Sequence, residues 1–206
     1  MRADMELLHA WREGDEHAGR ELFARHFDSV FRFFRNKVDG VADDLTQQTF
    51  LGCLRGREKF RGEASFRTYV FSIARKRLYT HYRDQQRKGV NLDFDQASVA
   101  DLAGLSPTAM IAERQEQRLL LRALRQLPLD MQIALELHYW EDLKVREIAE
   151  ILDVPSGTIK RRLQRARQQL ERNLAAASES PALLKSTLDN FSHWAGGLRK
   201  QLVPPS

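Results

Sequence analysis

Cysteine, clustered histidine and long apolar runs are what this 206-residue sequence lacks. Its single cysteine, Cys53, excludes an internal disulfide and has no cysteine or histidine neighbours at metal-ligand spacing. The six histidines are scattered, so the residues indicate no metal and no cofactor. No stretch approaches the roughly 20 apolar residues that a membrane helix needs. The opening residues, MRADMELLHAWREGD, lack the apolar core of a secretory signal, and we therefore expect a cytoplasmic protein.

The signatures of nucleic-acid enzymes are also missing. The sequence has no glycine-rich phosphate loop, no group of metal ligands and no paired carboxylates on a recognisable scaffold. Asp43 and Asp44 come nearest to such a pair, and a polar docking surface explains them better. We expect a protein that acts by binding and is not an enzyme.

Positive charge is present in excess and is unevenly spread. The net charge is +5, but residues 55–88 alone carry eleven Lys or Arg against three acids, and residues 160–172 carry six against one. Between these two basic segments, residues 89–112 contain three Asp and no Lys or Arg. Their poor periodicity is typical of a flexible linker. This distribution favours a polyanionic partner.

Apolar periodicity predicts helices throughout the first basic unit. Asp15 is placed to cap a helix with apolar residues at spacings of three and four, and Gly40 is expected to end it. A second helix is expected to start near Val41 and a third near Ser65. No alternating segment of useful length predicts a strand, so the expected fold is all-α.

The second unit is also predicted to be helical. Ser106-Pro107 is a start signal for a helix that stops at Leu127-Pro128, and LDMQIALELHYWE forms the next one. The following stretch, residues 144–170, reads KVREIAEILDVPSGTIKRRLQRARQQL. It predicts a short helix, a break at Asp153-Val154-Pro155, and a longer helix capped by Ser156.

The longer helix has two distinct faces. Its expected buried stripe is formed by Ile159, Leu163, Ala166, Leu170 and Leu174. Opposite that stripe lie Arg161, Arg165, Gln168 and Arg172. A short helix, a tight turn and a helix with a basic outer face form the helix-turn-helix pattern, whose second helix enters the major groove. A solvated helix of a bundle is the alternative, but residues 160–170 contain no acid, whereas such surfaces usually mix charges.

The segment EIAEILDVPSGTIKRRLQRAR closely resembles the C-terminal DNA-binding region of bacterial RNA polymerase sigma factors. The match is to the extracytoplasmic-function (ECF) group, with the pattern EIA-x-x-L-x-x-P-x-GT-V/I-K-x-R-x-x-RA. The resemblance implies recognition of the promoter −35 element by Ser156, Thr158, Lys160, Arg161, Arg162 and Arg165.

This chain departs from that pattern at three places, none on the recognition face. Lys144 replaces the usual Ser before the first helix, so we expect Asp142 to replace the lost cap. Asp153 stands where Gly is usual in the turn, and Gln132 stands near the usual Arg. These departures concern stability more than DNA recognition.

The N-terminal unit resembles the same family. ADDLTQQTFLGCL is similar to the segment that docks onto the β′ clamp helices of core RNA polymerase. By this resemblance the polymerase contacts are Asp44, Leu45, Gln47, Gln48 and Phe50. Read without the resemblance, these residues would indicate an ordinary solvated helix. The resemblance also implies the β subunit and an anti-sigma factor as further partners, and no small-molecule substrate.

KFRGEASFRTYVFSIARKRLYTHYRDQQRK resembles the segment that recognises and melts the −10 element. Holding an unstacked strand requires basic groups for its backbone, aromatic faces for its bases and a pocket for a flipped base. FRGEASF offers such a pocket, although Phe66 is as well suited to the core. Tyr69, Lys76 and Thr80 replace the common Trp, Asn and Asp, which affects base preference. The candidate residues are Phe60, Arg61, Gly62, Glu63, Ser65, Phe66, Arg67, Tyr69, Arg75, Lys76, Arg77 and Arg83.

The resemblance covers about 170 of the 206 residues and implies four parts. These are sigma region 2 (1–88), a linker (89–112), sigma region 4 (113–175) and a C-terminal extension of unknown role (176–206). The function expected is recruitment of core RNA polymerase to promoters, with −10 and −35 recognition and DNA melting. The alternative, a stand-alone helix-turn-helix regulator, explains residues 144–170 but leaves FRGEASF and its basic helix without a purpose.

Overall fold

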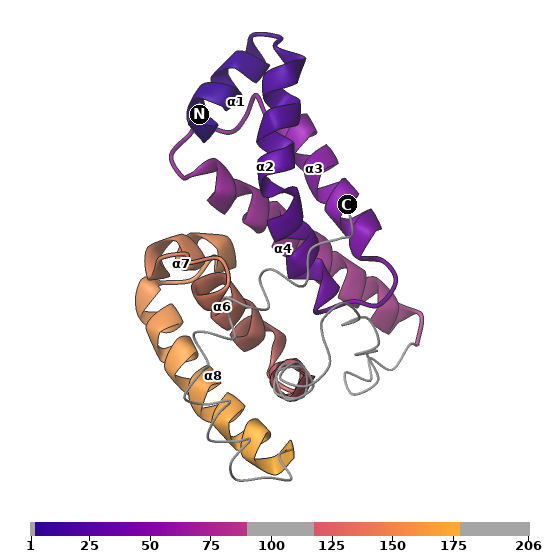
Figure 1. Cartoon of the computed structure of the whole chain (residues 1–206), viewed down its shortest axis with the longest axis vertical. Coiled ribbons are helices and arrows are strands. Elements are labelled where there is room, and N and C mark those ends of the chain that lie inside the picture. The colour runs from indigo at the N-terminus through magenta and orange to yellow at the C-terminus, as the bar shows by residue number, and fades with distance from the viewer. Residues whose placement is uncertain (1–2, 90–117, 178–206) are drawn as a thin grey trace, which may run out of the picture. The chain divides into compact units, whose positions relative to one another are not determined.

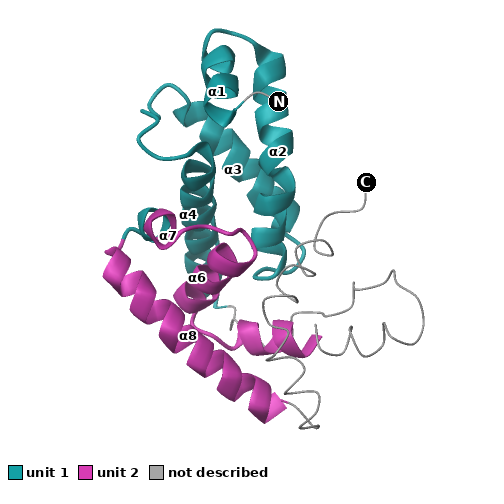
Figure 2. Ribbon diagram, turned by 60° about the vertical axis from the view of Figure 1, so that its left-hand side comes forward, with its two compact units in different colours: residues 1–92, 149–153, 203–206 teal, residues 93–148, 154–202 magenta. Residues whose placement is uncertain are grey.

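The computed structural model describes residues 3–89 and 118–177, and all regular secondary structure in these ranges is helical (Figure 1). The chain divides into two compact units, with the boundary drawn inside α7 (Figure 2). The first contains α1 (Asp4–Arg12), α2 (Glu16–Arg35), α3 (Ala42–Gly56) and α4 (Phe66–Arg87). The predicted all-α fold with two helical units is confirmed.

The second described range, residues 118–177, contains the helix-turn-helix. Residues 118–125 are helical and are followed by α6 (Leu129–Tyr139), α7 (Val145–Leu152) and α8 (Ser156–Ala177). The predicted linker, the Ser106-Pro107 start signal and the C-terminal extension from residue 178 lie outside the described residues. Within those residues, no helix has the length and apolar character to cross a membrane.

Two predicted helix starts are confirmed by their caps. The Asp15 carboxylate accepts from the backbone N–H groups of His17 and Ala18 at 2.9 and 3.1 Å, which starts α2. The Ser65 hydroxyl accepts from the N–H of Thr68 at 3.1 Å, which starts α4. Both side chains satisfy N–H groups that have no partner within their own helix.

Helix α2 ends at Arg35, before the predicted end at Gly40. The Lys37 ammonium donates to the carbonyl of Phe33 at 2.7 Å, and the N–H groups of Lys37 and Val38 both turn back to Phe34. A cation on a last-turn carbonyl stabilises the end of the helix at this point. Gly40 instead serves the turn into α3, with a φ of +71° that favours glycine.

Helix α1 has no counterpart among the predicted elements. Leu7, Leu8 and Trp11 form its buried face, and the Trp11 ring packs edge-on against Phe23 at 5.0 Å between centroids. A Cβ atom on Gly19 of α2 would lie 2.6 Å from this ring, so only glycine allows α1 to pack this closely. The spacing of these three apolar residues is the sequence signal for the helix.

The predicted buried stripe of α8 is confirmed. Its five apolar residues are at most 8% exposed. Helix α6 packs against α8, and the Asn173 amide of α8 donates to the carbonyl of Ala123 in the helical segment 118–125 at 3.0 Å. Asp153 adopts a φ of +53° in the turn, the left-handed conformation in which the usual Gly is favoured. The N–H of Lys144 donates to the Glu147 carboxylate at 2.9 Å, which is the half of a capping box that the N3 side chain supplies at the start of α7.

Candidate nucleic-acid and polymerase surfaces

A groove of about 850 Å³ lies in the first unit, lined by α3, α4 and the loop that joins them. Helix α3 contributes two glycines, the loop contributes Phe60 and its neighbours, and α4 contributes one polar and basic face. The lining consists of Gly52, Gly56, Lys59, Phe60, Arg61, Glu63, Ala64, Tyr69, Ser72, Ile73, Lys76, Arg77 and Thr80.

Two stacked aromatic rings form one wall of the groove. The Phe60 and Tyr69 centroids are 4.4 Å apart and the rings are inclined by 21°. A Cβ atom on Gly56 would overlap the Tyr69 Oη, and one on Gly52 would lie 2.9 Å from Cγ2 of Ile73. The two glycines therefore allow side chains of α4 to lie directly against α3. Burial raises the pKa of the Tyr69 hydroxyl above its ordinary value.

The groove carries more positive than negative charge. Its lining includes four basic side chains and one acid, Glu63. Glu63 lies 4.0 Å from Arg61, and both side chains are about four-fifths exposed, so this ion pair is weak. The basic residues are Lys59, Arg61, Lys76 and Arg77.

Several residues expected in the pocket lie elsewhere in the first unit. Phe66 is 1% exposed and its ring packs 5.5 Å from that of His26, which places it in the core. Ser65 caps α4, and Gly62 forms the loop turn with a φ of +76°. These residues shape the loop without lining the groove.

The remaining basic residues predicted for −10 recognition follow α4 outside the groove. Arg67 lies 6.0 Å from the ring of Phe71, and Arg75 lies 5.1 Å from that of Tyr79. Arg83 is exposed one turn beyond Thr80, the last lining residue. Of these three residues, Arg83 extends the basic side chains of α4 past the groove.

The outward side of α3 combines polar and apolar residues. Asp44, Gln47 and Gln48 are exposed, as predicted for a docking surface. Leu51 and Leu54 are 43% and 42% exposed and were not predicted. These five residues recur at helical spacing, and we call them the α3 outer strip.

Two other residues predicted to contact polymerase lie beneath that strip. Leu45 and Phe50 are 5% and 8% exposed, and the Phe50 ring packs 4.9 Å from that of Phe23. They hold α3 against α2. The structure therefore separates the predicted contact set into an exposed part and a buried supporting part.

Helix α8 presents a basic face opposite its buried stripe. Ser156, Lys160, Arg161 and Arg165 are exposed, and Thr158 is half-buried. Arg167 is also exposed, with its guanidinium 5.3 Å from the ring of Tyr139. Nothing acidic interrupts this face between residues 160 and 170.

Two family models match the chain, one in each unit. Sigma-70 region 2 matches residues 22–88, and sigma-70 region 4 matches residues 117–170. The chain is 28% identical over 179 residues to the ECF RNA polymerase sigma-E factor of Haemophilus influenzae, covering 83% of this chain and 95% of the relative. It is 27% identical over 176 residues to that of Escherichia coli K12, covering 82% and 92%.

The chain belongs to the ECF group of sigma-70 factors. It is a sigma factor, which directs RNA polymerase to promoters.

Solved structures support the same fold. The structure of CnrH in complex with the cytosolic domain of CnrY aligns with a TM-score of 0.62 at 20% identity, covering 86% of this chain and 100% of CnrH. The sigma factor RpoE of Bartonella quintana, in complex with the anti-sigma factor NepR, aligns with a TM-score of 0.58 at 23% identity, covering 75% and 92%.

One predicted DNA contact of this sigma factor is held by an ion pair. Arg162 Nη2 lies 3.1 Å from the Asp130 carboxylate at the start of α6, and the Arg162 side chain is 18% exposed. It therefore ties α8 to α6, while its neighbours Lys160 and Arg161 point outward. An acid at position 130 and a base at position 162 are far apart in sequence, so spacing alone could not pair them.

Proposed function

We propose that this sigma factor binds one promoter at two places while its α3 outer strip binds core RNA polymerase. The groove of region 2 takes an unstacked base of the −10 element, and α8 reads the −35 element in the major groove. The observation that carries the proposal is the groove itself, which is lined by the stacked rings of Phe60 and Tyr69, by two glycines of α3 and by four basic side chains.

The chemistry of the groove suits a base that has left the duplex. Unstacking costs a few kcal/mol, and a new stack on an aromatic side chain returns about 1–3 kcal/mol. The half-buried Phe60–Tyr69 pair offers an outer ring face for such a stack, and a volume of about 850 Å³ is ample for a nucleobase. Lys76 and Arg77 can hold the neighbouring phosphates, and the basic residues farther along α4 extend this path.

Helix α8 suits duplex DNA. Lys160 and Arg161 lie in its first two turns, where a recognition helix touches base edges, and both side chains are exposed. Arginine and lysine donate to guanine O6 and N7. Arg162 positions α8 through Asp130, and we assign it that role in place of a base contact.

The α3 outer strip suits a protein partner. Leu51 and Leu54 provide an apolar part in the C-terminal half of α3, and the carboxylate and amides of Asp44, Gln47 and Gln48 provide a polar part in the half before them. We propose that this strip binds core polymerase, with Leu45 and Phe50 supporting it from below.

We further propose that an anti-sigma factor binds this protein, since RpoE of B. quintana is held by one. The protein acts by binding and not by catalysis. Its place of action is the cytoplasm, where promoter DNA and polymerase meet.

Reconstituted transcription tests the proposal. Core polymerase with the full-length protein selects promoter fragments from a random-sequence pool, and run-off transcription is measured on the selected templates. We expect initiation only when both elements are intact. Leu51→Glu should abolish association with polymerase while leaving α8 able to bind duplex DNA. Duplex binding without any promoter-dependent initiation would instead identify a stand-alone regulator.

A further inference from the structure

The side chain of Arg12, on α1, holds the backbone of the loop that builds the groove. Its Nε and Nη2 atoms donate to the carbonyl oxygen of Arg57 at 3.0 and 2.7 Å, and Nη2 also donates to the carbonyl of Phe60. Arg57 follows the last residue of α3, and Phe60 forms the aromatic wall. One guanidinium thus fixes both ends of the segment 57–60.

The position of this guanidinium is favourable for two physical reasons. Carbonyl groups at the end of a helix have no partner within the helix, and they carry the negative end of its dipole. The N–H groups of Lys59 and Phe60 both turn back to Gly56, and Arg12 takes the next carbonyl, that of Arg57. Removing Arg12 would leave that carbonyl and the Phe60 carbonyl without these donors.

A second contact joins α1 to the same loop. A Cβ atom on Gly62 would lie 2.9 Å from the Met5 methyl group, so Met5 packs directly against the loop turn. The positive charge of Arg12 also acts on Tyr69 in the groove wall. Burial raises the pKa of Tyr69, and Arg12 lowers it. Helix α1 therefore contacts the loop at two places, through Arg12 at residues 57–60 and through Met5 at Gly62.

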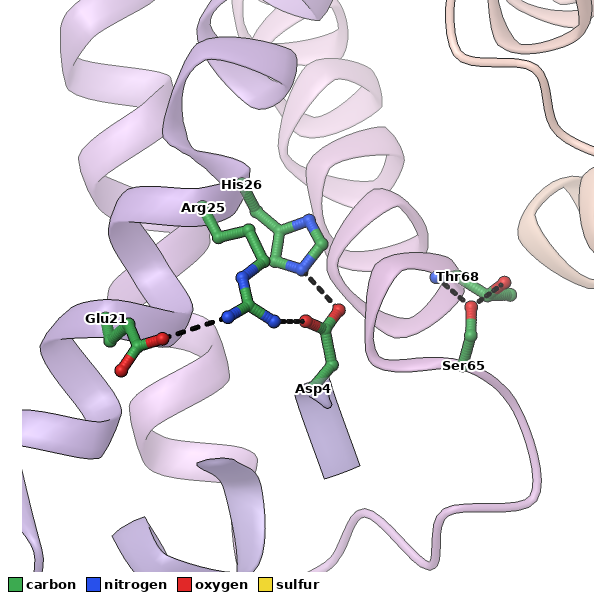
Figure 3. Close-up of polar contacts among 6 residues, drawn as sticks. All are labelled: Asp4, Glu21, Arg25, His26, Ser65 and Thr68. Atoms are coloured by element: carbon green, nitrogen blue, oxygen red, sulfur yellow. Dashed lines mark hydrogen bonds and ion pairs between the residues drawn. The ribbon is translucent and has the colours of Figure 1, made fainter. Parts of the chain in front are cut away.

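Helix α1 is itself firmly attached to α2. Asp4 accepts from Arg25 Nη1 and from His26 Nε2, each at 2.7 Å, as Figure 3 shows. Arg25 also bonds to Glu21 at 2.9 Å. Together with the buried Leu7, Leu8 and Trp11, these bonds fix the position of α1 and therefore the position of Arg12 relative to the loop.

We propose that Arg12 is a positioning residue for −10 recognition, which fixes the Phe60 carbonyl so that the Phe60 ring stays stacked on Tyr69 and the groove stays open to a base. The inference rests on the proposed function of the groove. Arg12 itself touches no DNA in this scheme. Its loss should therefore alter how the strand is held and which bases are preferred, beyond any change in the stability of the unit.

The test uses the full-length protein bound to core polymerase and a forked promoter fragment from the selected pool. The fork carries a duplex −35 element and a single-stranded −10 element with 2-aminopurine at successive positions; a fragment with the −35 duplex alone is the reference. The variants are Arg12→Gln and Arg12→Lys. Val38→Ala truncates a buried side chain that lies outside α1 and outside the loop, and Arg20→Gln changes an exposed arginine on α2.

For Arg12→Gln we expect binding to the fork to weaken about tenfold, as for loss of a charged hydrogen bond, with unchanged affinity for the −35 fragment. The 2-aminopurine signal of the captured base and the preference among −10 sequences should both diminish. Arg12→Lys, which keeps the charge, should recover part of the loss. Arg20→Gln should match the wild type, and Val38→Ala should retain the fork signal even where its thermal stability falls to that of Arg12→Gln.

Two results would lead to different conclusions. If the wild-type complex binds the fork no better than the −35 fragment, the proposed function of the groove is wrong. If the wild type does prefer the fork but Arg12→Gln and Val38→Ala lose the preference equally at equal stability, Arg12 merely stabilises the unit and this inference is wrong.

Discussion

Gly56 ends α3 directly beneath the Tyr69 hydroxyl, so its lack of a side chain has a measurable consequence. In Gly56→Ala the new methyl group would overlap Oη but would lie 3.6 Å from Cζ, an ordinary contact. Tyr69 must therefore move off Phe60, and we expect about tenfold weaker binding of the −10 single strand, the value of roughly one base stack. Stability should change little, because alanine is the better helix former.

The double variant Gly56→Ala/Tyr69→Phe provides the matched control, since it removes the one atom that overlaps. Binding to the forked fragment should recover toward that of Tyr69→Phe alone. If the double variant binds as weakly as Gly56→Ala, the contact with Oη does not explain the loss.

His26 gives the first unit a dependence on pH. Burial lowers its pKa below 6.5; Asp4 opposes this shift, and Arg67 and Arg25 add to it. The folded protein thus holds a neutral imidazole whose Nε2–H donates to Asp4. Below pH 6.5 the unfolded chain binds a proton that the folded chain resists, so stability is full above pH 6.5 and falls as the pH drops toward the lowered pKa.

Urea unfolding at pH 7.5, 6.5 and 5.5 measures this effect, with Trp11 as the only tryptophan after Trp140→Phe and Trp194→Phe. His26→Gln keeps a donor for Asp4 but cannot titrate, so its stability should fall less across this range. Some dependence of stability on pH should remain in His26→Gln, because burial also lowers the pKa of His81. An equal decline in both proteins would show that His26 is not its source.

At the scale of single elements, the turn between α7 and α8 contains strain that a substitution can relieve. Asp153 has a φ of +53°, a conformation that costs a residue with a Cβ about 1–2 kcal/mol. Asp153→Gly removes that strain and adds roughly 0.5–1 kcal/mol of backbone entropy to the unfolded chain. We expect a net stabilisation of about 0.5 kcal/mol in thermal or urea unfolding. Asp153→Ala keeps the Cβ and should not stabilise the unit; a gain equal to that of glycine would contradict this account.

The starts of α2 and α4 and the buried stripe of α8 were predicted correctly, because the residues that determine them lie close together in the sequence. Asp15 and Ser65 stand next to the N–H groups that they cap, and the α8 stripe lies within one helix, so sequence spacing was enough. The end of α2 was not predicted, because Gly40 is the stronger sequence signal and the bond from Lys37 to Phe33 depends on the folded backbone.

The candidate site was only partly predictable for the same reason. An aromatic residue suits both a core and a base-binding wall, so FRGEASF could not reveal that Phe60 lines the groove while Phe66 is buried. Gly52 and Gly56 matter only once α4 lies against α3. The bond between Arg12 and Phe60 joins residues 48 positions apart, which no local pattern indicates.

At the scale of the whole molecule, the basic groove and the basic face of α8 belong to different units and share no residue. Lys76 lines the groove and Arg161 is exposed on α8. If the two surfaces bind separate promoter elements, their free-energy contributions should add, as they do for independent sites. Lys76→Gln, Arg161→Gln and the double variant, each with core polymerase, form the cycle, and Kd is measured on a forked promoter carrying both elements.

The sum of the two single losses in binding free energy should equal the double loss within about 0.5 kcal/mol. Lys76→Gln should have no effect on a −35 duplex alone, and Arg161→Gln should lose most where the −35 sequence is optimal, because a base contact discriminates by about 1–3 kcal/mol. A coupling well above that limit would mean that the two surfaces meet on one DNA element. A double variant no worse than either single would mean that only one surface contacts the promoter.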